Sequence, residues 1–212
     1  TGSGIFQCVA TVQSGALTPT SFRVESIDPN GGARIPPIRI SPILIFADAG
    51  KRELRELSYN FAEDNFKSPH LFRFSEHLME GFFIKEIYNV YTPDSIVYVV
   101  RTDGTLLGLV YEQVENVIAW YRIVTQGEFK SGCKIPRPET GKDWHWVIVS
   151  RETGIFVEFF EPDATDTGRQ WHDLHTDCAV VATPNVNFVV SGLNHLEGTI
   201  CHVIGDGMLF ED

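Results

Sequence analysis

The sequence is poor in cysteine and has no long apolar run. Its four cysteines, Cys8, Cys133, Cys178 and Cys201, form no C-x-x-C pair in 212 residues. Such scattered thiols build neither a disulfide framework nor a zinc knuckle, so we expect reduced, small core residues of a protein made in a cytosol. No apolar run approaches the roughly 18 residues that span a bilayer, and no basic segment followed by an apolar one opens the chain. We therefore expect neither a membrane anchor nor a secretory leader.

Positive charge is also scarce. Lys and Arg number 17 against 28 Asp and Glu, which gives a formal net charge of −11. Binding a nucleic-acid backbone requires clustered cations, so the composition argues against a protein that grips DNA or RNA. A negative surface is compatible with nucleic acid that passes close by without being held, because attraction would slow its passage.

Recognisable catalytic motifs are missing. The chain contains no G-x-S-x-G and no phosphate-binding glycine loop. The one tempting cluster is "WHDLHTDC", whose candidate metal ligands are His172, His175 and Asp177. Its spacing matches neither the H-E-x-x-H helix nor a calcium loop, and it lies in a polar stretch typical of a solvated loop. We therefore expect no catalytic residue, no cofactor and no resident metal.

What the sequence does contain is a repeated hairpin. Strand-like runs flank a turn glycine in four places, at Gly50, Gly104, Gly154 and Gly207, spaced 54, 50 and 53 residues apart. The segments are 42–59, 95–112, 144–161 and 199–211. Glycine suits the positive φ that tight hairpin turns need, so its recurrence at one place in each unit has a mechanical reason.

Further strands surround these hairpins. Residues 83–125 read as four consecutive antiparallel strands, and a second unit begins at 128–136 and closes with 178–183 or 187–192. Residues 5–12 and 20–27 are strand-like too. We divide the chain into N-terminal strands with a connector (1–40), a repeat region (41–192), and the start of a further repeat or module (193–212).

The repeat predicts an all-β, propeller-like fold. Four-stranded meanders recurring every 40 to 50 residues are typical of β-propellers. The runs "IVYVV" and "LLGLV" are continuously apolar, which indicates strands buried on both faces. The alternative is two stacked sheets with accidental spacing. Because closed propellers need about four to eight blades, either residues 1–40 complete partial blades or other chains complete an open arc.

One short helix is predicted over 68–80. Ser68 can cap it, Pro69 suits the first helical position and Gly81 can end it. Leu71, Phe74 and Leu78 would then share one apolar face that packs over the sheets.

Three segments resemble a known family. They are "PDSIVYVVRTDGTLLGLVYEQVENVIAWYRIVTQGEF" (93–129), "KRELRELSYNFAEDNFKSPHLFRFSEHL" (51–78) and "SGLNHLEGTICHVIGDG" (191–207). Together, and in the order in which they follow one another along the chain, they are similar to the tail nozzle, or tail tubular protein B-like, family of short-tailed bacteriophages. The resemblance covers most of residues 42–207, although members of that family are typically much longer.

The resemblance implies a structural component of the virion tail. Several copies of such a protein form a ring or tube, propeller domains face outward, and the genome is ejected through the middle without sequence-specific binding. It implies further copies of the chain and adjacent tail or adaptor proteins as partners, with synthesis in the host cytoplasm. The residues expected to matter are then structural: the four turn glycines, the Trp120 strand and the 191–198 loop.

A carbohydrate-binding module for the host surface is the alternative. Trp144 and Trp146 alternate on one strand, with His145 on the opposite side, and exposed coplanar rings can stack on sugars. Core packing is the commoner role of such a pair, and of Trp120.

Arg101 and Arg122 are expected to form strand-end ion pairs with Glu112 or Glu115.

Overall fold

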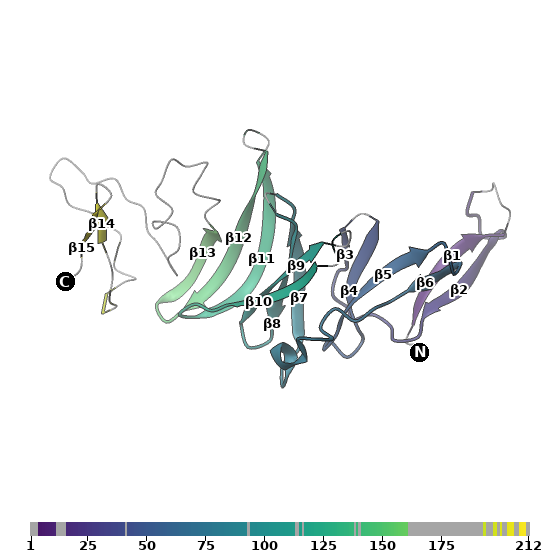
Figure 1. Cartoon of the computed structure of the whole chain (residues 1–212), viewed down its shortest axis with the longest axis horizontal. Coiled ribbons are helices and arrows are strands. Elements are labelled where there is room, and N and C mark those ends of the chain that lie inside the picture. Colours follow the sequence, from purple (N-terminus) through teal and green to yellow (C-terminus); the bar gives the residue numbers. More distant parts are fainter. Residues whose placement is uncertain are drawn as a thin grey trace.

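A computed structural model gives the fold as all-β (Figure 1). The structure describes residues 4–11, 16–40, 42–92, 94–112, 115, 117–137, 139, 141–160, 193, 197, 198, 200, 203–205 and 208–210. Within these ranges the helical content is one 3-10 turn, η1 (Glu76–Met79). No helix in the described part of the chain is long and apolar enough to cross a membrane.

In the part of the chain that the structure describes, the strands form five separate antiparallel sheets. The N-terminal ribbon consists of β1 (Ile5–Ala10) and β2 (Phe22–Asp28). The first sheet consists of β3 (Ile38–Ile40), β4 (Ile43–Ala47), β5 (Leu54–Asn60) and β6 (Asn65–Lys67). The second consists of β7 (Ile84–Val90), β8 (Ile96–Arg101), β9 (Leu106–Glu112) and β10 (Val117–Ile123). The third consists of β11 (Glu128–Arg137), β12 (Lys142–Arg151) and β13 (Gly154–Phe160), and the last hairpin of β14 (Val203–Gly205) and β15 (Met208–Phe210).

The predicted four-stranded meander over 83–125 is confirmed, and so are the first three strands of the second unit; its predicted closing strand, 178–183 or 187–192, lies outside the described residues. Strands of the first and second sheets lie side by side in sequence order, and in the third sheet β12 lies between β11 and β13. All four predicted hairpins are present as β4–β5, β8–β9, β12–β13 and β14–β15. The first sheet takes its edge strand β3 from the segment assigned to the connector, because residues 38–40 pair with 43–45.

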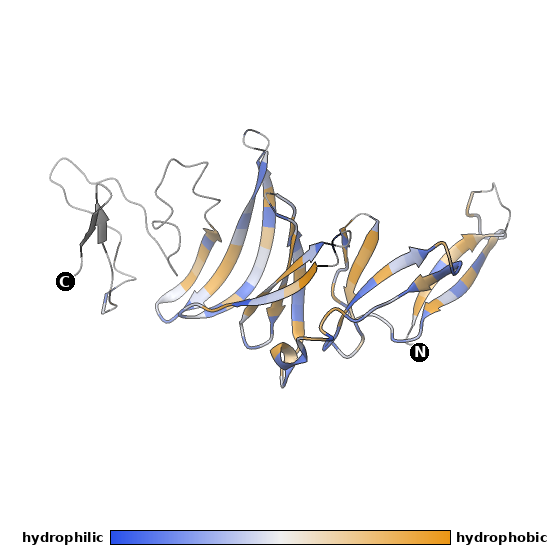
Figure 2. Cartoon of the chain, in the orientation of Figure 1, coloured by the Kyte–Doolittle hydropathy of each residue, from blue (hydrophilic) through white to orange (hydrophobic). Residues whose placement is uncertain are grey.

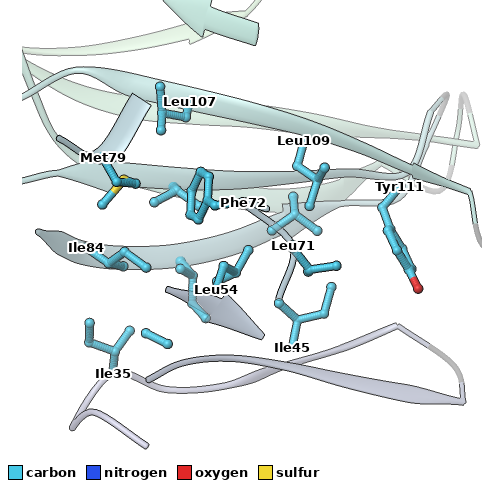
Figure 3. Packing of buried hydrophobic residues seen from close by; sticks show 14 of the residues in the cluster. Ile35, Ile45, Leu54, Leu71, Phe72, Met79, Ile84, Leu107, Leu109 and Tyr111 are labelled. Carbon is cyan, nitrogen blue, oxygen red and sulfur yellow. The ribbon is translucent and has the colours of Figure 1, made fainter. Parts of the chain in front are cut away.

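The central strands of the second sheet, β8 and β9, are buried on both faces, as their apolar runs predict, whereas the edge strand β10 is largely exposed. Val97, Val99, Leu107 and Leu109 belong to a core cluster shared with the first sheet (Figure 3). The alternate residues Tyr98, Val100 and Leu106 belong to a second cluster shared with Phe129, Val147 and Val149 of the third sheet. The first, second and third sheets are therefore packed face to face in the order of the sequence.

The hairpin turns use glycine in different ways. Gly104 (φ +82°) and Gly154 (φ +152°) have the positive φ that the sequence predicts. At the first hairpin the expectation is wrong, because the positive φ falls on Lys51 (φ +58°) and not on Gly50. The Asp48 carboxylate organises this longer turn by accepting hydrogen bonds from three backbone N–H groups, those of residues 50, 52 and 53, at 2.8–2.9 Å. Gly207 lies outside the described residues.

The helix predicted over 68–80 is wrong. The backbone of residues 69–71 instead extends the first sheet, since the Glu56 N–H donates to Pro69 O and the Leu71 N–H to Leu54 O. Helical turns form only at 76–79, without a side-chain cap. Leu71 enters the core as expected, but so does its neighbour Phe72, whereas Phe74 is 96% exposed. Once strand pairing uses these backbone groups, an amphipathic helix cannot form.

The prediction that the cysteines are core residues is also wrong where it can be checked. Cys8 on β1 and Cys133 on β11 are free thiols and both are exposed. Cys178 and Cys201 lie outside the described residues.

Candidate functional site

An aromatic junction joins the second sheet to the third. The hydroxyl of Tyr88 on β7 lies 2.7 Å from Nε2 of His145 on β12. The imidazole also lies against the Tyr98 ring, with centroids 4.1 Å apart, and stacks on Phe160 at 4.4 Å. Gly132 of β11 makes this packing possible, because a Cβ there would come nearer than 3.0 Å to the Tyr88 ring.

Burial holds the junction in its neutral form. His145 is only 5% exposed, and its Nδ1 has no hydrogen-bond partner. Desolvation lowers the pKa of His145 to about 3, because a charged ring would place an unpaired N–H in an apolar interior. Burial likewise raises the pKa of Tyr88 and Tyr98 well above the usual value for a phenol. His145, Tyr88 and Tyr98 are therefore all neutral near pH 7.

Arg101 connects the Asp103–Gly104 turn of the second sheet to the segment that contains η1. Its guanidinium pairs with the Asp103 carboxylate and donates to the carbonyl of Leu78 in η1. It also covers the Phe82 ring, 4.0 Å from the centroid. The hydrogen bonds from Arg101 lower the pKa of Asp103 to about 2. The predicted pairing of Arg101 with Glu112 or Glu115 is therefore wrong; the partner comes from its own turn.

The third sheet has an apolar outer face directed away from the second sheet. Register pairs Cys133 with Trp146 and Phe159, and Ile148 with Val157, on this side. We define the outer face by its apolar side chains: Ile135, Trp144, Trp146, Ile148, Ile155, Val157 and Phe159. Ile155 is 72% and Val157 68% exposed. Figure 2 shows apolar residues along β12 and β13.

The two tryptophans of this face are not a flat platform. Trp144 and Trp146 are half-buried, and their rings are inclined at 66° with centroids 5.6 Å apart. Trp144 instead stacks on Phe159 and lies beneath the guanidinium of Arg137. As the alternation predicts, His145 points to the opposite face of the strand.

A second exposed apolar face lies on the N-terminal ribbon, at the other end of the chain of sheets (Figure 2). Register places Phe6, Cys8, Phe22 and Val24 on one side of β1 and β2. Phe6 is 52% and Val24 55% exposed. An isolated two-stranded ribbon is at best marginally stable in water, so this face is suited to contact with another surface.

The opposite side of the ribbon borders an open depression of about 420 Å³. Its charged groups already have partners, since Arg23 pairs with Glu25 at 2.8 Å and the Tyr59 hydroxyl donates to Asp64. Nothing in this depression combines a nucleophile with a free base.

The candidate metal ligands cannot be placed. His172, His175 and Asp177 lie outside the described residues, as does most of the 191–198 loop. In the part of the chain that the structure describes, no three His, Cys, Asp or Glu side chains are grouped to hold a metal ion.

Trp120, by contrast, has a defined structural role. Its ring stacks on Phe72, with centroids 4.0 Å apart, and its indole N–H donates to Leu71 O at 2.9 Å.

Sequence reasoning missed the junction around Tyr88 and His145. The available signal was Gly132, because an isolated glycine within a strand often marks a close approach by a neighbour.

No protein-family model matches this chain, and no curated protein matches its sequence.

Proposed function

We propose that this chain is a structural component of a bacteriophage tail, in the tail nozzle or tail tubular protein B-like class, that assembles with copies of itself into a ring or tube. The observation that carries the proposal is a series of packed antiparallel sheets with exposed apolar faces at its two described ends. Exposed apolar faces of this kind mark surfaces that contact further modules or other molecules. The quoted sequence resemblance supplies the particular class.

The finer architecture proposed is propeller-like. Three features support it: consecutive meanders of about fifty residues, sheets packed in chain order, and a second sheet enclosed between its neighbours. In a propeller, each blade is enclosed in this way by the blades on either side.

The proposed work is mechanical. Tail proteins at adjoining levels would contact the assembly, and the genome would pass through its channel during ejection. The net charge of −11 supports passage without binding, because a negative wall repels the phosphate backbone. Within this proposal the protein belongs to the virion tail, is made in the host cytoplasm, and performs no catalysis.

The carbohydrate-binding alternative has less support. It expects exposed coplanar aromatic rings, and the Trp144–Trp146 pair is half-buried and inclined. The outer face of the third sheet is richer in aliphatic side chains than in polar groups that could recognise sugar hydroxyls. We therefore favour the assembly role.

Native mass spectrometry and electron microscopy of the full chain test the proposal. We expect closed rings of several copies. Val24→Lys, which places charge on the exposed ribbon face, should shift the population toward smaller species, whereas Thr20→Lys in the neighbouring turn should not. A chain that stays strictly monomeric at all concentrations and binds a defined glycan saturably would overturn the assembly role.

A further inference from the structure

The outer face of the third sheet differs from the corresponding faces of the sheets before it. The first and second sheets bury their facing sides against each other, as do the second and third. The third sheet has no such partner among the described residues, and Ile135 and Phe159 are 50% and 47% exposed there. The described part of this sheet also has three strands, where the first and second sheets have four.

The chain beyond this sheet continues the repeat. Gly207 follows Gly154 by 53 residues, and the two earlier intervals between turn glycines are 54 and 50 residues. On either side of this fourth turn, β14 and β15 pair as a hairpin, with Gly205 opposite Met208. This hairpin occupies the same phase of the repeat as β4–β5, β8–β9 and β12–β13. In Figure 1 it lies beyond β13, on the side away from the second sheet.

We propose that the outer face of the third sheet is the docking surface for the chain's own next module, the one that contains the β14–β15 hairpin. Each earlier junction joins modules that are adjacent in sequence, so the same rule assigns this face to residues 161–212. The partner it fits is an apolar sheet face, because the most exposed side chains of the outer face are aliphatic and the Arg137 guanidinium beside them already lies over the Trp144 ring.

Connectivity favours this occupant over a second copy of the chain. The β14–β15 hairpin is covalently linked to β13, with 42 residues between Phe160 and Val203, and such a link raises the effective concentration of the linked partner above that of a free molecule. A separate molecule at micromolar concentration competes poorly against such a partner. Docking at this face is a property of the single chain and does not rest on the proposed tail function.

Hydrogen exchange of the full chain, followed by mass spectrometry, tests the assignment. Val157→Lys places a charge on the outer face, in the middle of the edge strand β13, and Thr153→Lys adds the same charge at the exposed β12–β13 turn. We expect amides of residues 203–210 to be protected in the unaltered chain. Val157→Lys should raise their exchange rates about tenfold or more, equally at low and high protein concentration. Thr153→Lys should leave them unchanged.

Two results would overturn the proposal. Exchange of residues 203–210 that is already unprotected, or that does not respond to Val157→Lys, would show that this module does not cover the face. A response that appears only at high protein concentration would assign the face to a second copy. Amides of β11 to β13 report whether the third sheet stays folded. Should Val157→Lys unfold it, the milder Ile155→Ser at the most exposed position of the face gives the same comparison.

Discussion

The Tyr88 hydroxyl and the His145 imidazole meet 2.7 Å apart across the junction between the second and third sheets. They lie on β7 and β12, 57 residues apart in sequence, so their hydrogen bond forms only when the two sheets dock. Because Nδ1 of His145 is buried without a partner, protonation of the ring has no compensating contact. The pair therefore makes docking of these sheets sensitive to acid.

The stability of the protein should fall on mild acidification. Folding lowers the pKa of His145 from 6.5 to about 3, so its contribution is fully present above pH 6.5 and is lost as the pH falls toward 3. Between pH 7 and pH 5 this amounts to about 2 kcal/mol of unfolding free energy. Denaturant titrations at both pH values measure it. His145→Gln, which does not titrate, should remove that part of the pH dependence; an unchanged slope in the variant would contradict the assignment.

Gly132→Ala should destabilise the same junction. The added Cβ would overlap the Tyr88 ring, and overpacking of this kind costs about 1–3 kcal/mol. Gly32→Ala is the matched control, because its Cβ would meet its nearest neighbours at ordinary distances of 3.8 and 3.9 Å. Thermal unfolding compares the two variants. Combining Gly132→Ala with Tyr88→Ala should cost less than the sum of the single changes, and strict additivity would show that the ring is not the obstacle.

Arg101→Lys should loosen the turn at Asp103 even though the charge is kept. Lysine cannot reproduce the forked contacts to Asp103 and Leu78, and losing hydrogen bonds from a charged donor to these half-buried acceptors costs about 1–3 kcal/mol. The pKa of Asp103, held at about 2 mainly by hydrogen bonds from Arg101, should rise toward 3.8. Carboxyl NMR titration measures the pKa and urea unfolding the stability. Arg23→Lys in the exposed pair with Glu25 should change stability little.

The sheets were predictable from sequence because their signals are local. Turn glycines, apolar runs and spacing together identify the meanders and the enclosed strands of the second sheet. The helix prediction over 68–80 failed because it rests on the spacing of apolar residues alone. In the structure the backbone of residues 69–71 forms hydrogen bonds with β5 instead. The Tyr88–His145 contact depends on how two sheets dock, and such contacts between distant residues leave little trace in one sequence.

Trp120→Phe removes one hydrogen bond between the second sheet and residues 69–72 while keeping an aromatic ring at this position. Phenylalanine can still stack on Phe72, but the Leu71 carbonyl loses the indole N–H that now lies 2.9 Å away. The expected loss is about 1 kcal/mol of unfolding free energy, with faster hydrogen exchange at the Leu71 amide, which pairs with Leu54 O. Trp144→Phe, the same change on the outer face, should leave exchange at Leu71 as it is. Equal effects of both variants on Leu71 would mean that loss of ring size, and not of the hydrogen bond, loosens the segment.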